Sequence, residues 1–138
     1  MKISFYSEFN YHTFCEIIQL KNNLKKIARA EKCSIDYVNF NLISKRNIYK
    51  INKKFLRHFY TTDIITFNYS SNKKIRADIY ICIPVVKENS KVYNVSFVNE
   101  LKRVLIHGLL HCIGYDDKTK KERIIMRFKE DKYIKTLK

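Results

Sequence analysis

The chain has only two glycines and one proline among its 138 residues. Linkers and disordered segments are usually rich in these two residues, so their scarcity excludes a chain built largely from flexible segments. No uninterrupted apolar run reaches the roughly 18 residues of a membrane-spanning helix, and the N-terminal residues lack the basic-then-apolar pattern of an export signal. We therefore expect residues 1–138 to fold as one globular domain without a membrane segment.

Cysteine is also sparse, and the four cysteines, Cys15, Cys33, Cys82 and Cys112, lie far apart in the sequence. No Cys-x-x-Cys pair occurs, which excludes a zinc ribbon and a dithiol redox motif. Isolated cysteines of this kind are typical of buried thiols in a reducing compartment. The sequence thus predicts free thiols and a cytoplasmic protein.

Acidic residues are outnumbered, because 13 aspartates and glutamates face 28 lysines and arginines, for a net charge of +15. Such a charge attracts polyanions, with nucleic acid as the first candidate and an anionic membrane as another. A biased base composition is the alternative explanation, since the chain is rich in Lys, Asn, Ile, Tyr and Phe throughout. Hydrophobic residues make up 46% of the chain and include 10 tyrosines and 9 phenylalanines, enough for a real core.

Hydrophobic periodicity predicts four strands and about five helices. The expected strands lie near residues 3–5, 34–43, 63–69 and 75–83. The expected helices cover residues 13–32, 45–55, 84–92, 97–113 and a segment after residue 119. The last two strands should be antiparallel neighbours because turn-forming residues separate them, and the last helix should pack through an apolar stripe. That stripe consists of Ile124, Ile125, Phe128 and Tyr133. These elements indicate an α+β (mixed α/β) fold with a mixed sheet.

Capping residues set the helix boundaries. Ser44 and Ser96 are expected to cap the helices that follow them, and Thr119 with Glu122 forms a capping box. Gly114 is expected to end the fourth helix.

The segment from His107 to Asp117, His-Gly-Leu-Leu-His-Cys-Ile-Gly-Tyr-Asp-Asp, carries the candidate chemistry. His107 and His111 lie four residues apart, so on a helix their Cβ atoms are about 5 to 6 Å apart on one face and both imidazoles can reach one ion. A third ligand must come from chain that turns back, and Gly114 permits that turn. Asp116 and Asp117 both follow the turn. We prefer Asp117, because three residues give the chain more room to reverse.

Two histidines and one carboxylate leave a coordination position open, which is typical of a catalytic zinc ion that activates water for hydrolysis. Non-haem iron enzymes use the same ligand types, so iron is the alternative ion. Two ordinary helix histidines are the other reading, but Leu101, Val104, Leu105 and Leu109 make their surroundings apolar, and buried imidazoles there need a polar partner. We predict one Zn²⁺ ion per chain.

One residue type is missing from this motif. Metalloproteases of the His-Glu-x-x-His type place a general base directly after the first histidine, and Gly108 stands there in this chain. Peptidase activity is therefore not expected. Glu100 is the nearest carboxylate on the same face, although the pattern favours a solvated acid in the first turn of the helix.

The motif His-x-x-x-His-x-x-Gly-Tyr-Asp-x resembles that of the YbeY family, bacterial single-domain metal-dependent endoribonucleases that act in ribosomal RNA maturation. The likeness extends to three further stretches, residues 51–55 (Ile-Asn-Lys-Lys-Phe), 62–67 (Thr-Asp-Ile-Ile-Thr-Phe) and 77–84 (Ala-Asp-Ile-Tyr-Ile-Cys-Ile-Pro). Their order and spacing agree with the family across residues 34–133.

The resemblance implies one metal-dependent endoribonuclease domain over residues 1–138. It implies cleavage of single-stranded RNA by metal-activated water, acting in ribosomal RNA maturation and ribosome quality control in the cytoplasm. The implied substrate is a ribosomal RNA precursor, and the implied further partners are a ribosomal subunit or ribosomal proteins.

Three positions depart from the family pattern. Asp117 stands where the family usually has a third histidine, and its carboxylate is also a competent ligand. Ala77 replaces a glycine, which is tolerable if the strand does not need positive φ there. Leu56 occupies the position of an arginine, and Arg57, one residue later, is the candidate catalytic residue. A shift of one residue rotates a helical side chain by about 100°, so a helix-end arginine that contacts the terminal carbonyls is the alternative.

Two other functions fit the same features. A ribosomal RNA-binding protein with a structural metal would complete the coordination with a fourth ligand such as His58 or Cys112. A zinc hydrolase of small molecules would need a deep apolar pocket instead of a basic groove. Aromatic side chains, among them Phe59, Tyr60 and Tyr115, are candidates for stacking on unpaired bases in the endoribonuclease.

Overall fold

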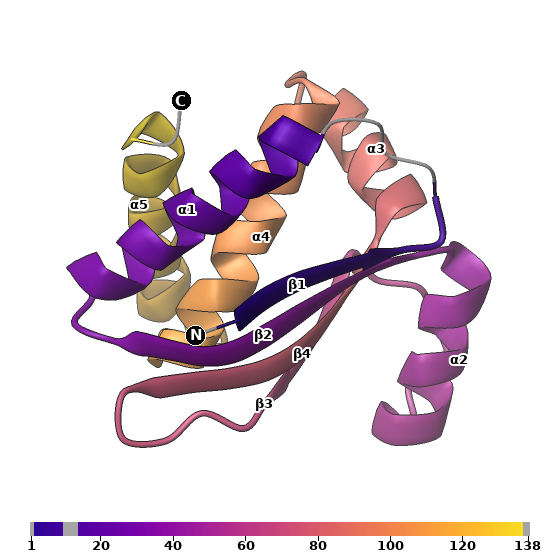
Figure 1. The fold of residues 1–138 in the computed structure, drawn as a ribbon. Coiled ribbons are helices and arrows are strands. Elements are labelled where there is room, and N and C mark those ends of the chain that lie inside the picture. The colour runs from indigo at the N-terminus through magenta and orange to yellow at the C-terminus, as the bar shows by residue number, and fades with distance from the viewer. Residues whose placement is uncertain (1, 10–13, 137–138) are drawn as a thin grey trace.

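The computed structural model describes residues 2–9 and 14–136, which form four strands and five helices (Figure 1). The strands are β1 (Lys2–Ser7), β2 (Ser34–Ile43), β3 (Ile64–Asn68) and β4 (Lys74–Cys82). The helices are α1 (Phe14–Ala30), α2 (Lys45–Leu56), α3 (Ile83–Val92), α4 (Phe97–Ile113) and α5 (Lys120–Thr136). The predicted α+β fold with a four-stranded mixed sheet is confirmed.

The strands form one sheet in the order β1-β2-β4-β3. β1 pairs with β2 and β2 with β4 in parallel, whereas β3 pairs with β4 antiparallel, as the turn between them predicts. β3 is therefore an edge strand. Ala77, which stands where the family pattern has a glycine, lies in the middle of β4. It is not among the described residues with positive φ, so alanine fits there without strain.

The helices divide unequally between the two faces of the sheet. Figure 1 shows α1, α3, α4 and α5 gathered on one side and α2 alone on the other, at one end. Alternate residues of β2 and β4 point into the main core, where Phe40, Ile79 and Ile81 are fully buried. α2 packs on the opposite face through Ile48, in a smaller cluster that includes Ile65. None of the helices in the described residues is both long and apolar enough to cross a membrane.

The predicted helix boundaries agree with the structure to within about two residues, because the capping signals are local. The hydroxyl of Ser44 accepts a hydrogen bond from the Asn47 amide, and that of Ser96 accepts one from the Asn99 amide. Thr119 and Glu122 form the reciprocal bonds of a capping box. The N-terminal limit predicted for the first helix, residue 13, lies outside the described residues.

The predicted packing face of the last helix is wrong. Ile124, Ile125 and Phe128 are 61%, 40% and 66% exposed, whereas Met126, Glu130 and Tyr133 are buried. Met126, Glu130 and Tyr133 follow helical spacing and form the inner face of α5. Of the predicted stripe only Tyr133 faces inward, because the inner face of α5 carries a buried carboxylate that the apolar pattern does not reveal.

Glu31, just after α1, joins α1 to α5 and to the chain beyond α4. Its carboxylate accepts hydrogen bonds from the hydroxyls of Tyr115 and Tyr133, and from the Lys129 ammonium group at 3.1 Å. Burial raises the pKa of the Glu31 carboxyl, but these three donors outweigh burial and hold the pKa below its ordinary value. The charged form is therefore favoured in the folded protein.

Replacing Glu31 by glutamine should destabilise the fold at neutral pH by about 1 to 3 kcal/mol, since charge-assisted hydrogen bonds are lost. Because the folded pKa is lowered, the stabilisation is present above the ordinary value of 4.5 and is lost as the pH falls through the folded value. Urea unfolding of Glu31→Gln and wild type from pH 7 down to about pH 2.5 covers this loss and measures the difference. The exposed Glu88→Gln variant is the control, and a difference that stays constant with pH would contradict the prediction.

Candidate metal centre

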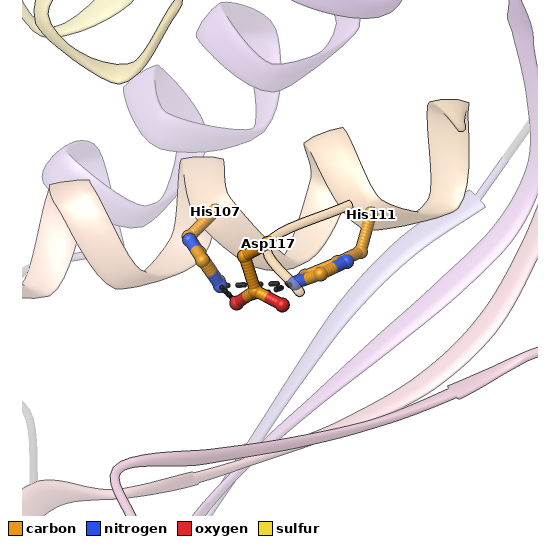
Figure 2. Close-up of side chains that lie close together, drawn as sticks. All are labelled: His107, His111 and Asp117. Atoms are coloured by element: carbon orange, nitrogen blue, oxygen red, sulfur yellow. Dashed lines mark hydrogen bonds and ion pairs between the residues drawn. The ribbon is translucent and has the colours of Figure 1, made fainter. Parts of the chain in front are cut away.

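α4 holds the two histidines at the edge of the sheet beside β3. Its apolar face, with Leu105 and Leu109 buried, packs on the core and leaves His107 and His111 on a neighbouring side of the helix. Both imidazoles project in the same direction (Figure 2), and their side chains are 23% and 24% exposed. Asn68 of β3 donates a hydrogen bond to the carbonyl of His111, which ties this part of α4 to the edge strand.

Gly108 explains why no glutamate follows the first histidine. A Cβ atom at this position would lie 2.9 Å from the Cδ1 atom of Ile64 and 3.2 Å from that of Ile79. A side chain at residue 108 would therefore require the ends of the Ile64 and Ile79 side chains to shift, so the packing of α4 on the sheet favours glycine here.

A sharp turn after α4 brings the third residue of the group back to the histidines. Gly114 has φ 126°, and its N–H donates to the carbonyls of Leu110 and His111. Few residues other than glycine adopt this backbone conformation, so the predicted role of Gly114 as the helix end is confirmed. The Arg123 guanidinium group then donates to the carbonyls of Asp117 and Lys118, which holds the returning segment against α5.

His107, His111 and Asp117 form a group that could hold a metal ion, as Figure 2 shows. The Asp117 Oδ2 atom lies 3.3 Å from the Nε2 atom of His107 and 3.4 Å from that of His111, and the two Nε2 atoms are 3.0 Å apart. Two ligand atoms about 2.1 Å from a tetrahedral ion are about 3.4 Å apart. The three atoms are therefore spaced as the ligands of a single ion would be.

The other residues considered as ligands, Asp116, His58 and Cys112, are not part of the three-residue group among the described residues. Asp116 accepts a hydrogen bond from the Asp117 amide and is not in the three-residue group. His58 is exposed and bonds to the Tyr60 hydroxyl, and Cys112 is buried, so within the described part of the chain neither supplies a fourth ligand. The prediction that Glu100 is a solvated acid in the first turn of α4 is wrong. The Glu100 side chain is buried, and burial raises the pKa of its carboxyl despite the opposing charge of Arg103.

Arg57 is not among the residues that border the metal group. It follows the last residue of α2 with φ 55°, and its N–H donates to the carbonyl of Asn52. Leu56 instead lines an open hollow of about 690 Å³ that also borders His107, His111 and Asp117. The catalytic role of Arg57 stays a prediction. Its position at the end of α2, with its N–H on a carbonyl of the last turn, is similar to the alternative, a helix-end arginine that contacts the terminal carbonyls.

Glu130 is a site residue that the sequence patterns did not reveal. Its Oε2 atom accepts a hydrogen bond from Nδ1 of His107 at 2.6 Å, and its Oε1 atom accepts one from Arg103 at 3.0 Å. Burial lowers the pKa of His107, but Glu130 outweighs burial and raises it. A carboxylate on the second nitrogen of a histidine fixes the ring and leaves Nε2 as the ligand atom. In the sequence, the only indication that Glu130 faces inward is its position one helical turn after the apolar residue Met126.

The turn at Gly114 should be necessary for the site. Gly114→Ala places a side chain on a backbone with φ 126°, which costs about 1 to 3 kcal/mol although no atom lies within 4 Å of the added Cβ. Thermal unfolding should show this loss, and zinc titration should show weaker binding because Asp117 is displaced. Lys73→Gly, at another position with positive φ, should be neutral or stabilising. Unchanged stability of Gly114→Ala would contradict the prediction.

Glu130→Gln should weaken zinc binding about 10- to 100-fold, the usual effect of removing a partner of a metal-bound histidine. Competition with a chromophoric chelator at pH 7 measures the affinity. Glu88→Gln is the matched control, since Glu88 is an exposed glutamate that pairs with Lys45. Equal affinities for the two variants would show that Glu130 does not support the site.

Comparisons with known proteins identify the family to which this chain is similar. The family model for Endoribonuclease YbeY matches residues 6–138. An Endoribonuclease YbeY from Cytophaga hutchinsonii is 43% identical over 130 residues, which cover 94% of this chain and 91% of that protein. One from Karelsulcia muelleri is 39% identical over 136 residues, covering 99% and 96%. The solution structure of TM1509 from Thermotoga maritima has a TM-score of 0.68 at 29% identity, covering 99% of this chain and 89% of that one. The chain belongs to the Endoribonuclease YbeY family.

Proposed function

We propose that this protein is a metal-dependent endoribonuclease that cleaves single-stranded RNA in ribosomal RNA maturation and ribosome quality control. Residues 1–138 act as one domain with one Zn²⁺ ion per chain, held by His107, His111 and Asp117. The observation that carries the proposal is the spacing of their three ligand atoms at the border of an open hollow. The family supports the nuclease activity.

The protein's own residues prepare this site in two ways. Glu130 accepts the Nδ1 proton of His107, so the imidazole presents Nε2 toward Asp117. Arg103 neutralises part of the Glu130 charge and keeps the carboxylate in place. When bound, zinc supplies Lewis acidity and lowers the pKa of a coordinated water to about 7.

The hollow beside these residues suits an extended phosphodiester better than a small apolar substrate. Polar groups of Thr62, Thr66 and Asn68 line it together with the metal group. Among the described lining residues, Lys118 is the only lysine or arginine, and it directly follows Asp117. The lining also carries the carboxylates of Asp63 and Asp116, so a phosphate would be attracted by the bound ion together with Lys118. A lining of this polarity favours cleavage of RNA over hydrolysis of a small apolar molecule.

A structural metal site in a ribosomal RNA-binding protein is the rival function. Structural zinc sites have four protein ligands, whereas the group found in the described residues has three and borders a hollow. Three ligands with one open position favour the enzyme. Two histidines and a carboxylate also suit iron, so the identity of the ion is part of the proposal.

The partners and the compartment follow from charge and cysteine chemistry. A net charge of +15 suits ribosomal RNA and the surface of a ribosomal subunit. Cys33, Cys82 and Cys112 are free thiols, with Cys82 and Cys112 buried, which supports the reducing cytoplasm. Cys15 lies outside the side chains that the structure describes.

Cleavage of a labelled single-stranded RNA should require the three ligands. Removing one ligand lowers the rate by at least about 100-fold, more than the loss of an outer partner. The assay compares zinc-loaded wild type, a chelated sample, His111→Ala and Asp117→Ala, all in preparations first shown to be free of contaminating ribonuclease. Asp36→Ala is the matched control, because Asp36 is an exposed aspartate that pairs with Arg76.

Equal cleavage by all samples would overturn the catalytic proposal. Loss of cleavage with unchanged RNA binding in His111→Ala would separate catalysis from recognition. Faster cleavage of duplex than of single-stranded RNA would contradict the proposed specificity.

A further inference from the structure

The segment from residue 44 to residue 62 has an unusual charge. It contains six lysines and arginines and no aspartate or glutamate. Three of these cations, Lys53, Lys54 and Arg57, lie at the C-terminal end of α2 and are exposed. None of the three forms a salt bridge with a described residue, and the Lys54 ammonium group lies 5.3 Å from the centroid of the exposed Phe55 ring.

Aromatic rings are exposed among these cations. Phe59 and Tyr60 are 67% and 56% exposed, although burying a ring of this size is strongly favourable. Tyr60 stacks on His58, with ring centroids 5.2 Å apart and ring planes within 15° of parallel. Both residues of this pair are exposed. We call Lys53, Lys54, Arg57, His58, Phe59 and Tyr60 the 53–60 surface.

The 53–60 surface is held in place from beneath. Asn52 is 1% exposed, and its side-chain amide donates a hydrogen bond to the carbonyl of Tyr60 at 2.9 Å. The carbonyl of Asn52 accepts hydrogen bonds from the N–H groups of Arg57 and His58. The buried Asn52 thus makes three hydrogen bonds to the loop after α2, one through its side-chain amide and two through its backbone carbonyl, so the rings of the loop are positioned before any ligand arrives.

The same segment borders the metal centre. Leu56 precedes the loop and Thr62 follows it, and both line the hollow that contains His107, His111 and Asp117. A chain that extends out of the hollow past Leu56 therefore meets the 53–60 surface next. Lys118 is the only described lysine or arginine that lines this hollow, and a neighbouring hollow that also borders His107 and Asp117 is lined by Arg103, Arg123 and Arg127. The 53–60 surface is therefore one of the basic flanks of the metal group.

We propose that the 53–60 surface binds the single-stranded RNA that flanks the cleaved phosphodiester. Lys53, Lys54 and Arg57 contact phosphates, and unpaired bases stack on Phe59 and on the Tyr60 and His58 pair. The proposal rests on the proposed function for the identity of the ligand. It assigns Arg57 to strand binding, away from the reacting atoms.

Single-stranded RNA fits this surface better than other polyanions. A positively charged face with exposed rings is how proteins bind unpaired strands, since every base has a face that can stack. A duplex offers phosphates but hides its bases. An anionic membrane would use the same charges and rings, and the experiment below includes it.

The test measures binding without cleavage. Fluorescence anisotropy with a labelled 12-nucleotide uridine RNA in the presence of chelator compares wild type with Phe59→Ala/Tyr60→Ala. The double variant should bind at least about tenfold more weakly, and Phe59→Tyr/Tyr60→Phe, which keeps both rings, should bind like wild type. Tyr6→Ala/Phe128→Ala is the matched control, because those rings are exposed on β1 and on the outer side of α5. Thermal unfolding checks that each variant folds.

A salt titration tests the cations. Lys53→Ala/Lys54→Ala should reduce the slope of log affinity against log salt by about 1.4, the value for two lost phosphate contacts on a single strand. Lower affinity with an unchanged slope would mean that these lysines do not contact phosphates, which would overturn that part of the proposal.

Three results would overturn the surface as a single-strand site. These are unchanged affinity of Phe59→Ala/Tyr60→Ala, an equal loss of affinity for a duplex of the same length, and loss of binding to phosphatidylserine vesicles with RNA binding intact. Because binding is measured with chelator present, a failed cleavage assay with this binding pattern intact would overturn only the nuclease proposal.

Discussion

The contact between Glu130 and His107 is the interaction on which the site and the last helix depend. A buried carboxylate is costly unless its charge is compensated, and Glu130 is compensated by His107 at 2.6 Å and by Arg103 at 3.0 Å. To make these contacts, α5 must turn the side of Glu130 toward α4. Ile124 and Phe128 are then exposed on the outer side, and the imidazole of His107 is fixed with one nitrogen toward Asp117.

Local signals in the sequence predicted local features well. The caps at Ser44 and Ser96, the helix end at Gly114 and the return of Asp117 each depend on a few neighbouring residues. What failed depends on partners distant in sequence. Glutamates are usually surface residues, and only the three-dimensional structure shows that Glu100 on α4 and Glu130 on α5 are both buried. A prediction from apolar periodicity alone assigns charged residues to the exposed side of a helix, even where they are buried in ion pairs.

The residues around the departure at Leu56 illustrate the same limit. The resemblance to the family made Arg57 the candidate for a missing arginine, but Arg57 follows the end of α2 with its backbone in a left-handed turn, and Leu56 lies at the hollow instead. The positive charge is retained in the segment while its position changes. Binding of an RNA strand through positive charge tolerates this shift of the arginine better than catalysis that needs a single guanidinium group at the reacting atoms.

The anchoring of Tyr115 by Glu31 also has a consequence for the order in which the protein is assembled. The two residues are separated by 84 positions in the sequence, and the same carboxylate binds Tyr133 across 102 positions. Contacts of such separation form only after the intervening chain has been synthesised and has collapsed. The loop with Asp117 and the carboxylate behind His107 therefore reach their places together, when α5 docks. A partly synthesised chain has the two histidines but lacks Glu130 behind His107, so the group of His107, His111 and Asp117 should be fully held in place only after α5 has docked.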